Sequence, residues 1–168
     1  DSIITLCPHF NTHRMLEEYE EWFYRPAQTY TERLRADYMT EAKSLAEWYR
    51  RIEANWAQVS IAEVKHEGPD ELTIGEQLTI TARVHLGELA PEDVKVEVYY
   101  GHLDPAGRFV DRKLLLMEPE RPENGVYLFR AALLCRKTGK FGYRIRVSPH
   151  HPHLMSSHYS QGSLVTWG

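Results

Sequence analysis

A histidine-rich stretch near the C-terminus carries side chains that could hold a metal ion. Pro149-His150-His151-Pro152-His153-Leu154 places three imidazoles close together, and His158 follows. Imidazole is a good zinc ligand, but a structural zinc site needs four donors that converge in a fixed geometry. No cysteine lies close to these histidines in the sequence. The stretch is therefore predicted to be a polar surface loop, with metal binding as the alternative interpretation.

Four glutamates near the N-terminus, Glu17, Glu18, Glu20 and Glu21, resemble paired catalytic carboxylates. General acid and base chemistry needs carboxylates in different environments that separate their pKa values. Neighbours on one helical face share the same solvent. The sequence therefore predicts a solvated helix face.

Aromatic side chains could stack on sugar rings or form a protein interface. The candidates are Trp22, Trp48, Trp56, Trp167, Tyr99 and Tyr100. Trp22, Trp48, Trp56 and Tyr100 fall on apolar stripes, where packing is the simpler use of a large ring. Pocket walls and cores look alike in a sequence, so sugar contact stays open for each of them.

Thr138-Gly139-Lys140 has a glycine beside a lysine but lacks the full Gly-x-x-x-x-Gly-Lys-Ser/Thr phosphate-binding pattern. A hairpin turn between two strands is the favoured interpretation. No serine–histidine–aspartate or cysteine–histidine pattern stands out. The sequence therefore predicts no catalytic, cofactor-binding or metal-binding residue in this chain.

The elements that would carry these residues follow two hydrophobic periods. Up to about Ala57 the period is helical: Asn11 or Thr12 could cap a first helix, which Pro26 should end near Tyr24 or Arg25. Thr29-Tyr30-Thr31-Glu32 has the spacing of a capping box for a second, long helix. A weak stretch at 37–40 could break that long helix in two. The apolar stripe of the long helix comprises Leu34, Tyr38, Ala42, Leu45, Trp48, Ile52 and Trp56.

After Ala57 the period changes to two, which is typical of half-buried strands. About seven strands are expected, at 59–65, 78–86, 94–100, 113–117, 126–133, 141–147 and 164–167. The sequence thus predicts an α+β fold. A helical segment of two or three helices over residues 1–57 would precede an antiparallel, immunoglobulin-like β-sandwich over 58–168.

The composition disfavours two classes of function, nucleic-acid binding and membrane insertion. The chain has 168 residues, is 42% hydrophobic and 26% charged, and has a net charge of −4. Without a basic surface, nucleic acid is a poor partner, and no apolar run is long enough for a membrane helix.

Cys7 and Cys135 form no Cys-x-x-Cys pair and are expected to be reduced, buried thiols. The absence of a secretory signal favours a cytoplasmic protein. The start at Asp1, without Met, is what an excised fragment would look like.

Three segments of the chain resemble the C-terminal region of bacterial and archaeal α-glucan phosphorylases, relatives of glycogen phosphorylase. The first runs from Ser2 to Ala27 and includes Phe10-Asn11-Thr12-His13-Arg14-Met15-Leu16-Glu17-Glu18-Tyr19. The second is 139–152, a late strand followed by a His-Pro turn. The third is Gly162-Ser163-Leu164-Val165-Thr166-Trp167.

This resemblance implies a parent enzyme that cleaves α-1,4-glucan with phosphate, releases glucose 1-phosphate and binds pyridoxal phosphate on a lysine. In the family that lysine precedes the matched region, in a loop rich in glycine and small residues. The lysines of this chain, Lys43, Lys65, Lys95, Lys113, Lys137 and Lys140, do not stand in that context. The chain is therefore expected to be an inactive accessory and scaffolding segment whose partners are the remaining parent domains.

Two rival functions remain open at the level of the sequence. The first is a carbohydrate-binding immunoglobulin-like module that holds α-glucan through exposed, coplanar aromatic rings. The second is an oligomerisation element, because an excised amphipathic helix leaves its apolar stripe exposed.

Overall fold

The computed structural model of the protein describes residues 12–69, 71–120, 126–154 and 164–168. Asn11, Cys7, His158 and the predicted turn at 122–125 lie outside these residues. The chain divides into two compact units, Asp1–Glu47 and Trp48–Gly168. The predicted domain boundary between residues 57 and 58 stays a prediction.

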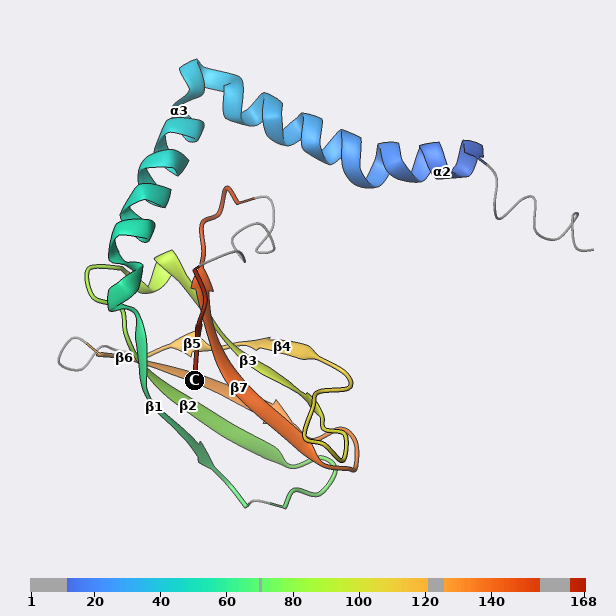
Figure 1. Cartoon of the computed structure of the whole chain (residues 1–168), viewed down its shortest axis with the longest axis vertical. Helices are drawn as coiled ribbons and strands as arrows, with labels where there is room; N and C mark the ends of the chain where they lie inside the picture. The colour runs from blue at the N-terminus through green and yellow to red at the C-terminus, as the bar shows by residue number, and fades with distance from the viewer. Residues whose placement is uncertain (1–11, 70, 121–125, 155–163) are drawn as a thin grey trace, which may run out of the picture. The chain divides into compact units, whose positions relative to one another are not determined.

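One long helical segment replaces the two or three separate helices that the sequence predicts. It comprises α2 (Thr12–Tyr19), the π-helical η1 (Glu20–Tyr24) and α3 (Arg25–Asn55), which follow one another directly (Figure 1).

The predicted helix end before Pro26 is wrong. In η1 the Arg25 N–H donates to the Glu20 carbonyl, the i to i−5 pattern of a π-helix. An α-helix would bring the Pro26 ring against the carbonyl of residue i−4 and lose a hydrogen bond there. Just before Pro26, π-helical hydrogen bonds therefore take the place of the α-helical hydrogen bonds that the proline ring would disrupt. The predicted capping box is wrong too, because Thr29 lies inside α3.

The weak stretch at 37–40 does interrupt the helix, as the sequence predicts. Ala36 has an extended ψ of 159°, and Asp37, Tyr38 and Met39 have φ angles of 47°, 54° and 62°. Residues with side chains rarely adopt this left-handed region. Tyr38, which the sequence assigns to the buried stripe, is 91% exposed at this point.

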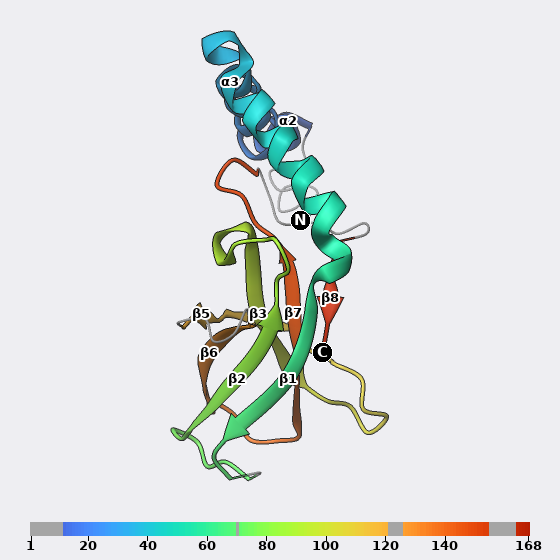
Figure 2. The same cartoon turned by 90° about the vertical axis from the view of Figure 1, so that its left-hand side faces the viewer.

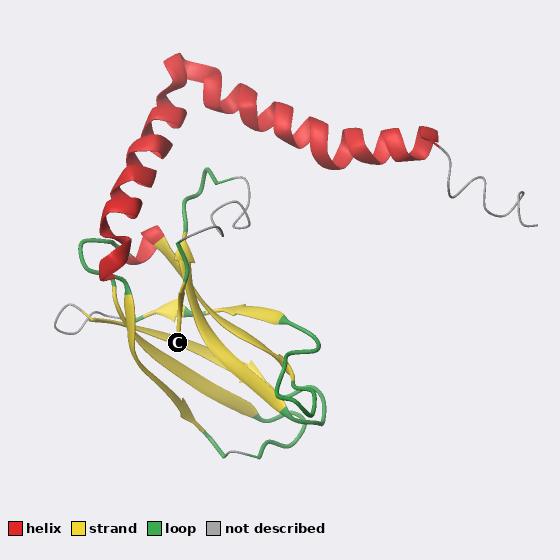
Figure 3. Ribbon diagram, in the orientation of Figure 1, coloured by secondary structure: helices red, strands yellow, loops and turns green. Residues whose placement is uncertain are grey.

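The second unit contains two four-stranded sheets, and every strand pair in them is antiparallel (Figure 3). The first sheet has the order β1-β2-β6-β5 and the second the order β4-β3-β7-β8. The first sheet contains β1 (Ser60–Glu67), β2 (Gln77–His85), β5 (Glu118–Pro119) and β6 (Val126–Leu134). The second contains β3 (Val94–His102), β4 (Lys113–Leu116), β7 (Phe141–Pro149) and β8 (Thr166–Trp167). Short 3₁₀ turns, η2 (Trp56–Gln58) and η3 (Pro91–Asp93), precede β1 and β3.

The period-two pattern explains which side chains form the core between the two sheets, whose strands Figure 2 shows. Ile80, Ala82 and Val84 of β2 are fully buried, as are Val98 of β3 and Ile145 of β7. Intervening residues such as Thr79 and Arg144 point away from it. All seven predicted strands are found, together with β5, which the sequence did not predict. The fold is therefore α+β with two antiparallel four-stranded sheets, and its immunoglobulin-like character stays a prediction.

No helix among the described residues combines the length and apolar character needed to cross a membrane.

Truncation of a fully buried side chain tests the assignment of the core. We expect Ile145→Ala to lower the free energy of unfolding by about 2–5 kcal/mol, because it leaves a cavity between the sheets. Ile74→Ala is the matched control, since Ile74 is 63% exposed and should lose less than about 1 kcal/mol. Urea denaturation measures both. Equal losses would contradict the core described above.

Candidate functional site

Asp93 accepts hydrogen bonds from several segments of the second unit. The Pro91-Glu92-Asp93 turn places its buried carboxylate opposite the end of α3. Arg51 donates two hydrogen bonds to it, at 2.8 and 2.7 Å, and the indole N–H of Trp48 donates a third at 2.9 Å. The backbone N–H of Ala90 donates a fourth at 3.0 Å. These contacts tie the last turns of α3 to the chain between the two sheets.

The electrostatics of this cluster favour an ionised Asp93. Burial by itself would raise the pKa of Asp93. The hydrogen bonds from Ala90, Arg51 and Trp48, together with the Arg51 charge, outweigh burial and hold the pKa below its usual value. The carboxylate is therefore a structural anchor whose hydrogen-bonding capacity is used within the protein.

The histidine-rich loop packs against this anchor. The His150 N–H donates to the Asp93 carbonyl at 2.8 Å, and the His151 ring lies 4.9 Å from the Trp48 ring. Burial lowers the pKa of His150, assisted by the charges of Lys95 and His151. Burial also lowers the pKa of His151, assisted by His153. The described part of the chain contains no group of three or more His, Cys, Asp or Glu residues placed to hold a metal ion.

The acidic run lies on the helical segment of the first unit, where its members pair with nearby basic residues. Glu17 lies 3.1 Å from His13, Glu18 lies 3.4 Å from Arg14 and Glu20 lies 3.1 Å from Arg25. Such exposed pairs one helical turn apart stabilise a helix weakly.

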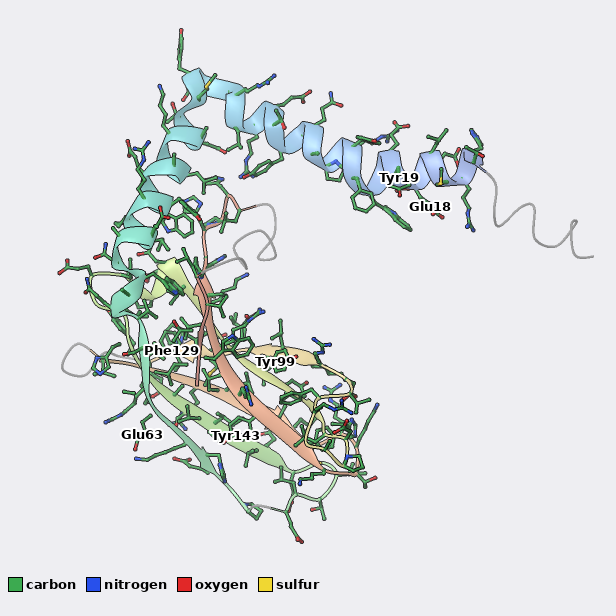
Figure 4. All side chains as sticks on the ribbon, in the orientation of Figure 1. Glu18, Tyr19, Glu63, Tyr99, Phe129 and Tyr143 are labelled. Carbon is green, nitrogen blue, oxygen red and sulfur yellow. The ribbon has the colours of Figure 1, made fainter. Side chains whose placement is uncertain are left out.

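The apolar residues of the same segment are exposed. Tyr19 and Phe23 contact each other with ring centroids 5.6 Å apart, and no residue of α2 or η1 is buried (Figure 4). We call the exposed large apolar residues of this segment the helix face; they are Met15, Leu16, Tyr19, Trp22, Phe23 and Tyr24.

The predicted aromatic candidates separate into four environments. Trp48 and Trp56 are core residues, with 6% and 7% exposure, so packing is confirmed for them. Trp22, which the sequence assigned to a packed stripe, is 62% exposed on the helix face.

Tyr99 and Trp167 come together on the outer face of the second sheet. Tyr99 makes edge-on contacts with Phe109, at 5.0 Å and 89°, and with Trp167, at 5.4 Å and 88°. Trp167 is about half exposed. Perpendicular rings do not form the flat, coplanar platform on which a sugar chain stacks.

Tyr100 lines a cavity of about 640 Å³ at the end of the sheets where β2 and β7 begin. The Thr138-Gly139-Lys140 hairpin lies at its edge, and Gly139 has a φ of 124°, which explains glycine in this turn. Half-buried Cys135, predicted to be buried, also lines it.

Sequence reasoning missed Asp93, Arg51 and Phe109. The pattern Ala-Pro-Glu-Asp marks a short helical turn and could have drawn attention to Asp93. The partner Arg51 lies 42 residues away, a distance that no local pattern bridges.

Comparison with known proteins agrees with this architecture. Residues 56–167 match the family model described as the glycogen phosphorylase C-terminal domain. A glycogen phosphorylase of Mycobacterium tuberculosis (strain CDC 1551 / Oshkosh) is 35% identical over 96% of this chain, and that of Mycobacterium bovis is equally similar. A maltodextrin phosphorylase of Thermococcus litoralis is 29% identical over 99% of the chain.

The chain therefore belongs to the glycogen phosphorylase C-terminal domain family. It spans only 19% of the length of each of these phosphorylases. The resemblance predicted from the sequence segments is confirmed.

Loss of the Asp93 charge should destabilise the second unit in a pH-dependent way. We expect Asp93→Asn to lower the free energy of unfolding at pH 7 by about 1–3 kcal/mol, because Arg51 loses its anionic partner. The pKa of Asp93 is lower in the folded state, so its contribution is present above the usual Asp pKa and disappears as the pH falls through the folded value. The difference between wild type and variant should therefore shrink below about pH 4.

Glu53→Gln is the matched control, since Glu53 is an exposed carboxylate on the same helix. Urea denaturation at several pH values measures the effect. A difference between wild type and Asp93→Asn that is constant from pH 7 to pH 3 would contradict the anchor.

Proposed function

We propose that this chain is a C-terminal accessory and scaffolding segment of an α-glucan phosphorylase and does not catalyse the reaction by itself. The observation that carries the proposal is the exposed helix face. It lies in a chain that aligns almost entirely with phosphorylases about five times its length.

The helix face favours a large partner. Leu16, Trp22 and Phe23 each expose about 60% of their surface. Complete burial of such side chains is worth about 1.5–3 kcal/mol each, and short helices rarely persist in water without tertiary packing. We assign this face to the remaining domains of the parent enzyme, in which α2 and η1 would close the catalytic core.

The second unit favours a scaffolding role. Its core is supplied by its own residues, and its end of α3 is fixed by Asp93. In our proposal residues 58–168 form an immunoglobulin-like sandwich, and the preceding helical segment connects it to the catalytic domains.

The parent reaction would be phosphorolysis of α-1,4-glucan to glucose 1-phosphate with pyridoxal phosphate. A cofactor lysine is activated by a desolvated site. Here Lys95 is half-buried and the other lysines are exposed. This distribution supports a cofactor lysine elsewhere in the parent.

The structure gives less support to the two rival functions, glucan binding and oligomerisation, than to the accessory role. The perpendicular rings of Tyr99, Phe109 and Trp167 do not favour a stacked glucan chain on that face. Oligomerisation through the helix face uses the same observation as our proposal.

Activity of the isolated chain is the direct test. We expect the purified chain to show no pyridoxal absorption band and to release no glucose 1-phosphate from maltodextrin and phosphate, with or without added pyridoxal phosphate. A characterised glucan phosphorylase assayed in parallel is the positive control. Cofactor-dependent release by the chain alone would overturn the proposal.

The helix face should also govern the behaviour of the isolated chain. The triple variant Leu16→Gln, Trp22→Gln, Phe23→Gln keeps good helix formers but removes apolar surface. We expect it to reduce concentration-dependent self-association in light scattering and to leave the main melting transition within about 2 °C of wild type, since these residues lie outside the second unit's core.

The matched control replaces three exposed polar residues of the same segment, Glu17, Glu21 and Arg35, by Gln. A discrete dimer that persists unchanged in the triple variant would contradict the assignment of the helix face as the surface that drives self-association.

A further inference from the structure

The cavity at the loop end of the second unit has a defined place in the fold. The loop residues 68–69, 71–76, 103–112 and 135–140 lie at this end of the sheets (Figure 3). Strands of both sheets border it, with Leu78 and Leu133 from the first sheet and Tyr100 and Tyr143 from the second. A volume of about 640 Å³ lies in the range of small-molecule sites.

Its aromatic wall continues the inner face of the second sheet. Val98 pairs with Ile145 in the buried core, and two residues further along Tyr100 pairs with Tyr143. The next pair on this face is His102 with Phe141, whose rings lie 4.0 Å apart. The inner face thus changes from aliphatic to aromatic where it reaches the cavity, and its rings there are only partly buried.

The edge of the cavity is positively charged. Arg136, Lys137 and Lys140 line it, and all three are exposed. None of them forms an ion pair with a residue in the described ranges. Glu71 is the only carboxylate among the described lining residues. The described lining residues therefore carry an excess of two positive charges, unlike the chain as a whole.

Hydrogen bonds hold this charged hairpin in place before any ligand arrives. Cys135 exchanges backbone hydrogen bonds of 2.9 Å with Gly75 and Glu76, and the Leu103 N–H donates to the Lys140 carbonyl at 2.9 Å. His102 contacts both oxygens of Asp111 at 3.0 Å, which fixes the ring that contacts Phe141.

Polar groups are also fixed on the opposite side. The His66 ring of β1 and the Tyr143 hydroxyl of β7 share a hydrogen bond of 3.0 Å between the two sheets. A ligand in the cavity would therefore meet aromatic faces and a hydroxyl inside, and cations at the entrance.

We propose that this cavity binds a small phosphate ester that carries a ring, with the phosphate at Arg136, Lys137 and Lys140 and the ring against Tyr100, Phe141 and Tyr143. Charged hydrogen bonds from arginine and lysine recognise phosphate, and aromatic walls favour a ring face. A neutral sugar would leave the cations without a partner, and inorganic phosphate would leave the aromatic wall empty. Sugar phosphates and nucleotides share this chemistry, and binding here does not depend on the scaffolding role.

Amide chemical-shift titration of the full chain tests the proposal with four probes: glucose 1-phosphate, uridine monophosphate, maltotriose and inorganic phosphate. We expect at least one ester to bind more tightly than maltotriose and inorganic phosphate, with shifts centred on residues 135–143 and affinity that falls as salt rises. The ester that binds better identifies the ring. Tighter or equal binding of maltotriose or inorganic phosphate, or no shift up to about 10 mM ester, a weak-affinity limit, overturns the proposal.

Charge removal is the second arm. Lys137→Ala with Lys140→Ala should weaken ester binding by about tenfold, the order expected for two exposed charge contacts. The matched control, Lys43→Ala with Lys113→Ala, removes two exposed lysines that do not line the cavity and should leave the affinity unchanged. Equal affinities in the two double variants overturn the proposal.

Ring removal is the third arm. Phe141→Ala should weaken ester binding but not inorganic phosphate binding, while Phe109→Ala, an aromatic outside the cavity, should change neither. Thermal melts confirm that each variant is folded, and Phe141→Leu replaces Phe141→Ala if that variant unfolds. Unchanged ester affinity in a folded Phe141 variant overturns the ring contact.

Discussion

The buried carboxylate of Asp93 is the constraint on which the second unit is organised. Its side chain accepts hydrogen bonds from Arg51 and Trp48 at the end of α3 and from the backbone of Ala90, while its own carbonyl accepts from His150 after β7. Three chain segments far apart in sequence, the end of α3, the turn at 90–93 and the start of the histidine-rich loop, thus meet at one residue. Because an unpaired buried charge is strongly unfavourable, these partners must assemble together. The cluster fixes where the helical segment ends and where the first strand can start.

Family membership and geometry together explain why one helical segment has two kinds of apolar surface. Trp48 and Ile52 are buried in the second unit, whereas the helix face from Met15 to Tyr24 is exposed. Both surfaces arise from the same spacing of three or four residues. The two surfaces differ in whether the partner that would cover them is part of this chain. A chain spanning 19% of its phosphorylase relatives supplies the partner for the end of α3, and in our proposal the parent enzyme supplies the other.

Local patterns predicted the strands well, because alternation over residues such as Leu78 to Leu86 follows directly from strand geometry. They failed where the backbone departs from the regular α-helix, or where loops outside the strand determine what surrounds a side chain. Pro26 was expected to end a helix, but a change from α to π bonding just before it keeps the segment continuous. Tyr38 fitted an apolar stripe, yet a left-handed backbone places it in solvent. Tyr100 was assigned to core packing, but it lines a cavity. The loops beyond the strand ends, and not the strand pattern, determine where the packed core stops.

The outermost strands of both sheets carry a consequence for the protein in concentrated solution. An open sheet edge offers unpaired backbone groups to any further strand, and proteins protect such edges with short strands, proline, charges or bulges. Here β5 and β8 are two residues long, and β5 contains Pro119. Edge strand β1 has a register shift between Ile61 and Glu63 and carries Lys65. These three edges are therefore protected against strand addition from another copy of the chain, whereas the fourth edge strand, β4, exposes Leu114 and Leu116.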